Sequence, residues 1–82
     1  MMYVKVLFVN KVQQYAGETK TILELPDSVD VKYLLQELCG QKPAMKDIVK
    51  YLNISVNNVM APRHRMLQNG DEVILFFRMG GG

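Results

Sequence analysis

The two most apolar segments of this chain lie near its two ends, and their placement constrains the fold more than any other feature. Residues 2–10 are rich in β-branched and aromatic side chains, and residues 72–77 form a second run of strand-forming residues. Strands this apolar are covered on much of both faces, so they belong at the centre of a sheet. We therefore expect the first and last strands to lie side by side and parallel in the middle of one sheet.

The part of the chain that follows the first strand contains a second strand and the main helix. Apolar spacing predicts a short helix at residues 11–16, and alternating side chains predict a strand at residues 19–25, which Pro26 ends. Ser28 is the predicted N-cap of the main helix, and Gly40 is its predicted C′ residue. The apolar stripe that predicts this helix consists of Val31, Leu34, Leu35 and Leu38.

The region between the main helix and the last strand is less regular. Pro43 could open a short helix, or residues 41–51 could be irregular. Alternation predicts a strand at residues 52–56, followed by a turn at Asn57-Asn58 and a brief strand at residues 59–61. Asn69-Gly70 predicts a second turn, which leads into the last strand.

The length and the order of the elements indicate the fold class. Eighty-two residues are enough for one small domain with one core. The order strand, strand, helix, strand, short strand, strand predicts a two-layer α+β fold, in which one main helix packs across a mixed sheet. We assign residues 1–77 to this domain and residues 78–82 to a flexible C-terminal tail.

The sequence ends on three glycines, Gly80, Gly81 and Gly82, shortly after the apolar strand. Glycine has no Cβ, so these residues can pass through a channel as narrow as a backbone, and the carboxylate of Gly82 is unhindered. A terminal glycine run can also be an inert linker or the remnant of a fusion. Because this run follows a strand rather than a polar segment, we favour a carrier whose terminal carboxylate enters a partner's active site.

Charge and cysteine content argue against several classes of protein. Ten basic and eight acidic residues give a formal charge of +2, and the basic residues are scattered along the sequence, so we expect no nucleic-acid partner. Cys39 is the only cysteine, which rules out an internal disulfide and is typical of a reducing cytoplasm. No signal-peptide pattern is present, and no apolar run approaches the ~20 residues that span a bilayer. We expect a soluble, cytoplasmic protein without a membrane partner.

Few side chains suggest catalysis. Cys39 has no neighbouring His or basic residue in the sequence and is best explained as an incidental thiol. His64 lies in a polar loop without partners for a metal site. The carboxylates of Asp71 and Glu72 diverge if they lie in a strand, so we expect these residues to form a turn. Arg78 is the exception, because a cation at the root of the tail could guide or pair with a partner's acidic groove, although a solvated strand end explains it nearly as well.

Several motifs give the chain a resemblance to a known family. They are Lys5-Val6-Leu7-Phe8 in the first strand, the short helix that ends at Gly17, Ser28-Val29-Asp30 at the start of the main helix, Val56-Asn57-Asn58 at the end of the third strand, and Leu67-Gln68-Asn69-Gly70-Asp71-Glu72-Val73 before the terminal glycines. With these motifs the chain resembles the ubiquitin-like β-grasp sulfur carriers of the MoaD and ThiS type over nearly its whole length. It resembles the small subunit of molybdopterin synthase most closely. It departs from that subunit in having Phe77-Arg78-Met79 where prolines are usual, and three terminal glycines where two are usual.

The resemblance implies a chemistry for the last residue. In these carriers an activating enzyme of the MoeB or ThiF type uses ATP to adenylate the C-terminal glycine, and a sulfur donor displaces AMP to leave a thiocarboxylate. The matching residue here is Gly82, or Gly81 if the end is trimmed. In molybdopterin synthase the tail enters the large, MoaE-like subunit and donates sulfur to the pterin precursor. The resemblance implies no bound cofactor or metal, and no enzyme activity of the carrier alone.

A tail of this kind binds weakly by itself, so we predict an apolar docking patch near its root. Its predicted members are Met60, Phe76, Phe77, Arg78 and Met79. Adjacent residues of a strand point to opposite faces. One of the two phenylalanines should therefore belong to the core and the other to the patch, and the sequence does not say which.

Other functions also fit the sequence. The same carrier chemistry could serve thiazole synthesis, tRNA thiolation or conjugation to lysines. A β-grasp binding module with an inert tail would need no chemistry at all.

Overall fold

A five-stranded sheet and one main helix form the body of the protein. The computed structural model describes residues 1–78, and residues 79–82 lie outside the described part. The strands are β1 (Met2–Phe8), β2 (Lys20–Leu25), β3 (Leu52–Val56), β4 (Val59–Met60) and β5 (Glu72–Phe77). The helices are α1 (Val12–Ala16) and α2 (Val31–Gln41), and two short 3₁₀ helices, η1 (Pro43–Asp47) and η2 (Val49–Tyr51), follow α2. Within residues 1–78, every helix is too short or too polar to cross a membrane.

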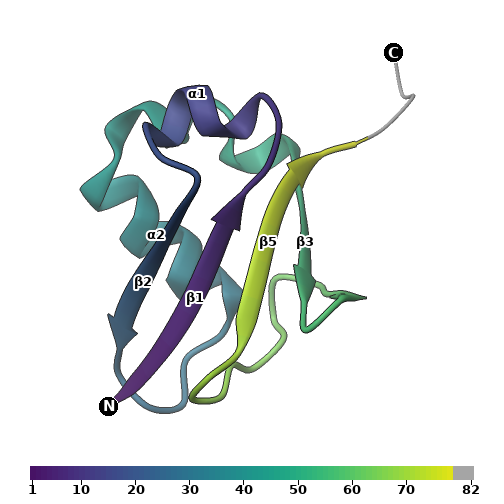
Figure 1. Cartoon of the computed structure of the whole chain (residues 1–82). Coiled ribbons are helices and arrows are strands. Elements are labelled where there is room, and N and C mark those ends of the chain that lie inside the picture. Colours follow the sequence, from purple (N-terminus) through teal and green to yellow (C-terminus); the bar gives the residue numbers. More distant parts are fainter. Residues whose placement is uncertain (79–82) are drawn as a thin grey trace.

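The first and last strands occupy the centre of the sheet, as the sequence predicts. The strand order is β2-β1-β5-β3-β4; β1 runs parallel to β5, and the other neighbours are antiparallel. Figure 1 shows α2 behind the sheet and no helix in front of β1, β5 and β3. The predicted α+β fold, a mixed sheet with one main helix across it, is confirmed. Within residues 1–78 the other face of the sheet carries no helix, and we call it the open face.

Alternating side chains along the strands separate a buried face from this open face. In β1 the side chains of Val4, Val6 and Phe8 are buried, whereas those of Tyr3 and Lys5 are exposed. The buried face shares one core with the predicted apolar stripe of α2, whose members Val31, Leu34, Leu35 and Leu38 are all buried. The helical spacing in the sequence therefore identified the core face of α2 correctly.

The N-terminus of α2 differs from the prediction. Ser28 is not the N-cap, because its backbone is left-handed with a φ of 63°. Asp30 caps the helix instead, and its carboxylate accepts a hydrogen bond from the amide of Tyr33 at 2.9 Å. Both residues are good caps by type, so the sequence alone did not separate them.

A loop that is distant in the sequence accepts hydrogen bonds from the first backbone amides of α2. The amide of Val31 donates to the carbonyl of Arg65 at 3.0 Å, and the amide of Lys32 donates to the carbonyl of Arg63 at 2.9 Å. The first amides of a helix have no partner within the helix. Here a tertiary contact supplies these partners and ties residues 63–65 to the start of α2.

The C-terminus of α2 also differs from the prediction. Gly40 is not the C′ residue, because the helix continues through Gln41 and ends with Lys42 as the C-cap. The amide of Lys42 donates to the carbonyl of Leu38 at 2.7 Å, which closes the last turn. Of the two alternatives for residues 41–51, the helical one is correct, since η1 opens at Pro43.

Both predicted turns are present. Asn57 and Asn58 have φ values of 52° and 69°, and they form the two-residue connection between β3 and β4. Positive φ at both positions is typical of the tight hairpin turns that Asn favours. Gly70 has a φ of 87°, and its amide donates to the carbonyl of Tyr3 at 2.8 Å.

A hydrogen-bonded clasp joins these two turns, and its members come from the motifs that carry the family resemblance. The carboxylate of Asp71 accepts from the Asn57 side-chain amide at 2.9 Å and from the Gln68 backbone amide at 2.8 Å. The side-chain carbonyl of Asn57 accepts from the backbone amide of Glu72 at 3.0 Å. Asp71 is nearly buried, with 6% of its surface exposed. The prediction of a turn is confirmed for Asp71, whose amide donates to the carbonyl of Gln68, and is wrong for Glu72, which is the first residue of β5.

Candidate functional site

The last described residues leave the body from a strand that is held on both sides. β5 pairs with β1 on one edge and with β3 on the other, and Phe77 lies opposite Leu52. Arg78 follows and is exposed. Figure 1 shows this end of β5 on the opposite side of the body from the N-terminus. The sheet therefore fixes the point from which the residues after Arg78 start.

The two phenylalanines at the end of β5 point to different faces. Phe77 is partly buried against the core, and its ring meets the ring of Tyr15 edge-on with centroids 6.4 Å apart. Phe76 lies opposite Asn53 of β3 and, by alternation, on the open face. The structure thus settles the point that the sequence left open: Phe77 belongs to the core side and Phe76 to the open face.

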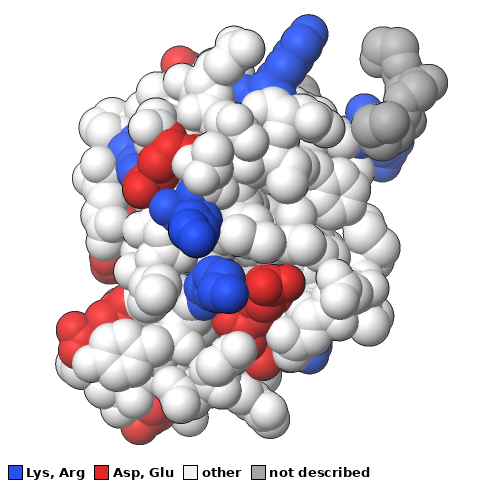
Figure 2. Space-filling model, in the orientation of Figure 1, with Lys and Arg blue, Asp and Glu red and all other residues white. Residues whose placement is uncertain are grey.

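Apolar side chains gather on the open face near the end of β5. We call Leu7, Met60, Ile74 and Phe76 the sheet patch. Leu7 pairs with Ile74, and Ser55 of β3 pairs with both Ile74 and Met60, so Leu7, Ile74 and Met60 lie in one row across the sheet. Phe76 lies two residues beyond Ile74 on the same strand and therefore on the same face. Met60 is 60% exposed. Figure 2 shows uncharged side chains over β3 and the end of β5, whereas charged residues gather over β1, β2 and the beginning of β5. Leu7, Ile74 and Phe76 are partly exposed, so the sheet patch is apolar surface that solvent reaches.

The other side of the tail root is polar and basic. A hollow of about 630 Å³ lies there, and its lining consists of Lys50, Tyr51, Leu52, Asn53, Arg63, Phe77 and Arg78. Three of these side chains are cationic, and none of them is acidic. Arg78 therefore belongs to a cluster with Lys50 and Arg63. The sequence did not reveal this cluster, because its members come from three separate segments.

The remaining predicted residues lie in different places. Met79 and the glycines at positions 80–82 lie outside the described residues, so their roles stay predictions. Partial burial raises the pKa of the Cys39 thiol above its ordinary value, although the nearby Lys46 acts in the opposite direction. His64 is exposed. Within residues 1–78, no three His, Cys, Asp or Glu side chains gather in a way that could hold a metal ion.

The fold and the position of β5 define a class of protein. A mixed sheet with its first and last strands parallel at the centre, and with one main helix across it, is the ubiquitin-like β-grasp fold. More particularly, the chain belongs to the ThiS family, which matches residues 6–82. The resemblance to sulfur carriers of the MoaD and ThiS type is thereby confirmed.

Individual relatives agree with this assignment. The chain is 30% identical, over the whole of both chains, to the molybdopterin synthase sulfur carrier subunit of Mycobacterium tuberculosis. Its fold is similar to that of small archaeal modifier protein 1 of Haloferax volcanii, with a TM-score of 0.89, 20% identity and coverage of 96% of this chain and 100% of that one. It is also similar to a chain in the complex of subunits 1 and 2 of the molybdopterin-converting factor of Helicobacter pylori, with a TM-score of 0.71, 22% identity and coverage of 99% and 100%.

Proposed function

We propose that this chain is a sulfur carrier that acts as the small subunit of molybdopterin synthase. The observation that carries the proposal is the full-length match to a molybdopterin synthase sulfur carrier subunit, in a chain whose central strand leads to three terminal glycines. The Helicobacter pylori complex, in which a similar chain is bound to its second subunit, supports a large-subunit partner.

The reacting group in this proposal is the carboxylate of Gly82. A carboxylate is a poor electrophile, so an activating enzyme joins it to AMP from ATP and releases pyrophosphate. A sulfur nucleophile at the oxidation level of sulfide then attacks the carbonyl carbon and displaces AMP, which leaves a thiocarboxylate. The tail next enters the large subunit, where the thiocarboxylate sulfur attacks the pterin precursor. The carrier supplies the sulfur, and the partner supplies the acid and base groups.

The energetics of the tail explain why a docking surface is needed. Ordering five residues costs roughly 5 to 10 kcal/mol at about 1 to 2 kcal/mol per residue. Apolar burial returns about 25 cal/mol per Å², so on the order of 400 Å² of buried surface offsets the upper figure. We propose that the sheet patch provides this surface, with Phe76 and Met60 as its principal contacts and Arg78 beside the tail. Phe77 contributes from the core side by holding the end of β5 in place.

Mass spectrometry of a reconstituted reaction tests the proposal. The purified chain is incubated with ATP, a sulfide source and the activating enzyme encoded in the same genome. Replacement of one carboxylate oxygen by sulfur adds about 16 Da to the intact protein. The treated chain, mixed with the large subunit and the pterin precursor, is then expected to yield molybdopterin. A variant that lacks Gly81 and Gly82 serves as the control and should show neither result. An unmodified mass with a competent activating enzyme would support an inert binding module instead.

A further inference from the structure

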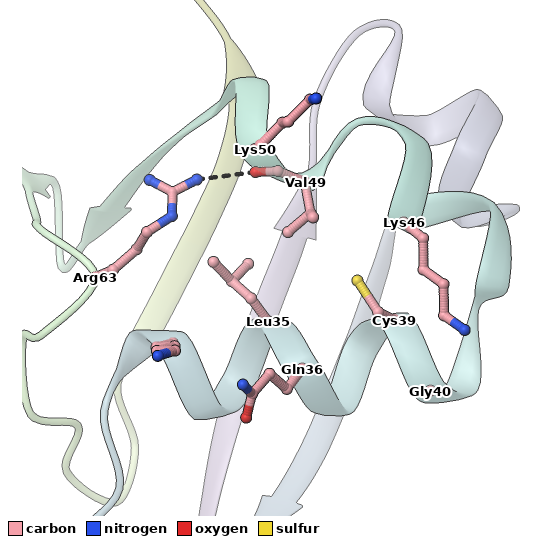
Figure 3. Close-up of a pocket in the computed structure, with 9 residues that line it drawn as sticks. Leu35, Gln36, Cys39, Gly40, Lys46, Val49, Lys50 and Arg63 are labelled. Carbon is pink, nitrogen blue, oxygen red and sulfur yellow. Dashed lines mark hydrogen bonds between the residues drawn. The ribbon is translucent and has the colours of Figure 1, made fainter.

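A second surface lies on the helix side of the molecule, away from the sheet patch. It is a groove of about 570 Å³ between α2, the 3₁₀ segments and the loop that carries Arg63. Figure 3 shows Leu35 and Cys39 from α2 and Val49 from η2 pointing toward one another at its floor. Leu35 is buried, and Cys39 and Val49 are partly buried. The floor is therefore apolar and open to an incoming side chain.

Cations line this groove, and the described part of the chain contributes no acidic side chain to it. Its charged lining residues are Lys32, Lys46, Lys50 and Arg63, and the described residues that line it include no Asp or Glu. Among residues 1–78, none of these four has a carboxylate within 4.0 Å, whereas Lys5, Lys42 and Arg65 each lie beside one. The groove thus gathers four positive charges that have no ion-pair partner within residues 1–78, and such a surface attracts a negatively charged partner.

One of these cations is held in a fixed position. The guanidinium of Arg63 donates to the carbonyl of Val49 at 2.8 Å and to that of Leu52 at 3.3 Å. Figure 3 shows the first of these bonds at the edge of the groove. The carbonyl of Arg63 in turn accepts from the amide of Lys32 at the start of α2. Because Arg63 is already ordered, a ligand that meets it loses little additional side-chain entropy.

We propose that this groove is a docking site for an acidic segment of a partner protein, which places an apolar side chain on the floor between Leu35 and Val49. The cations stand around the groove rather than converging on one point: Figure 3 places Arg63 at one end and Lys46 at the other. An extended chain of carboxylates matches this arrangement better than a single phosphate does. The described lining contains no aromatic ring on which a base could stack, which argues against single-stranded nucleic acid.

This site goes beyond the sulfur chemistry proposed above. The groove lies on the α2 side of the sheet, and the sheet patch lies on the open side. A protein bound in the groove therefore leaves the patch accessible. The groove shares Lys50 and Arg63 with the hollow at the tail root, so a partner in the groove reaches the root of the tail and leaves the sheet patch free for another partner.

A titration with synthetic peptides tests the groove directly. The probe is a short peptide with a Leu-Phe pair between runs of glutamate, and the matched control peptide has every glutamate replaced by glutamine. With ¹⁵N-labelled protein, we expect the acidic peptide to shift amide signals of α2, η1 and η2 in a saturable way. We also expect it to slow alkylation of Cys39 by iodoacetamide, because the single thiol lies in the floor. The glutamine peptide should do neither.

Charge reversal locates the binding site. The double variant Lys32→Glu and Lys46→Glu leaves the tail root untouched, and we expect it to weaken binding of the acidic peptide by about tenfold or more. The matched control, Lys11→Glu and Lys20→Glu, makes the same change in net charge at two exposed lysines outside the groove. It should change the affinity by less than about twofold. Higher salt should weaken binding to the wild-type chain as well.

Several results would overturn the proposal. They are equal binding of the glutamine peptide, shifts centred on the sheet patch, an equal loss of affinity in the control variant, and no saturable binding. Tighter binding of single-stranded oligonucleotide, or of inorganic phosphate alone, would assign the groove to another class of ligand. The test uses no sulfur transfer, so its result is independent of the proposed carrier function.

Discussion

At the scale of single residues, Asp71 shows how one side chain can join two motifs. Its carboxylate accepts one hydrogen bond from the Gln68 amide, within the turn at residues 68–71. It accepts another from the side-chain amide of Asn57, at the tip of the β3–β4 hairpin. Replacement by alanine removes both hydrogen bonds to the carboxylate, and water can reach the donors because Asn57 and Gln68 are exposed. A hydrogen bond to a charged group contributes about 1.5–3 kcal/mol, so we expect Asp71→Ala to lower the free energy of unfolding by about 1–3 kcal/mol.

Urea denaturation followed by circular dichroism measures this loss. Asp47→Ala is the matched control, because Asp47 is exposed and the structure gives it no ion pair within residues 1–78. Its effect should stay within about 0.5 kcal/mol. Equal stability of Asp71→Ala and Asp47→Ala would show that the clasp is not needed for the fold.

Alanine substitutions of the two phenylalanines at the end of β5 should affect different properties, one the stability of the fold and the other the binding of the large subunit. Phe77 packs against the core and Tyr15, so Phe77→Ala should cost about 2–3 kcal/mol, below the range for a fully buried ring. Phe76 lies on the open face, so Phe76→Ala should cost about 1 kcal/mol or less. Its larger effect should be on the dissociation constant for the large subunit, measured by calorimetry. The opposite order of the two stability losses would contradict this assignment.

These residues also show what the sequence could and could not predict. Alternation in β5 established that Phe76 and Phe77 point to opposite faces. The choice between the faces depends on Tyr15 and on pairing with β3, which are contacts between distant segments. The basic cluster of Lys50, Arg63 and Arg78 was missed for the same reason. The spacing of apolar residues along the chain predicts whether a segment is a helix or a strand and which residues share a face. Contacts between distant segments determine which side chains lie next to that face.

At the scale of elements, α2 departs from its local sequence at both ends. Gly40 lies inside the helix, where glycine is less favourable than alanine, and a Cβ at this position would meet nothing within 4 Å. We therefore expect Gly40→Ala to raise the free energy of unfolding by about 0.5–1 kcal/mol. Thermal denaturation followed by circular dichroism at the helix band is the appropriate measurement.

Gly17→Ala is a control for which we expect the opposite change in stability. A Cβ there would also meet nothing within 4 Å, but the backbone φ of Gly17 is 77°. An L-residue in the left-handed region costs roughly 1–2 kcal/mol, so Gly17→Ala should lower the melting temperature while Gly40→Ala raises it. A fall in both variants would mean that the end of α2 is not helical at Gly40.

The helix ends also explain why boundaries were harder to predict than the elements themselves. The apolar stripe from Val31 to Leu38 fixed the existence and the core face of α2. The start of the helix is set by the loop carbonyls of Arg63 and Arg65, which are more than twenty positions away. The sequence near Ser28 and Asp30 contains no sign of that loop, so the choice between the two caps could not be made locally.

At the scale of the whole molecule, the proposed function divides the chain into the body that the structure describes and the terminal glycines that would react. The core runs from Met2 to Leu75, and Phe77 packs against it from the end of β5. The sheet patch lies on one side of this body and the basic groove on the other. Both surfaces consist of side chains on strands, helices or a loop that is tied to α2, so the body can present them without the terminal glycines.

This separation predicts that the end of the chain can be removed without loss of the fold. Deletion of Gly81 and Gly82 removes no core residue of the described structure, so the melting temperature should change by less than that of Phe77→Ala. The deletion variant should still bind the large subunit through the sheet patch, more weakly than the full chain. It should form no thiocarboxylate and no molybdopterin, because the reacting carboxylate is displaced from its position relative to the body. A melting temperature as low as that of Phe77→Ala would show that the last glycines stabilise the body, and the division between scaffold and reacting end would then be wrong.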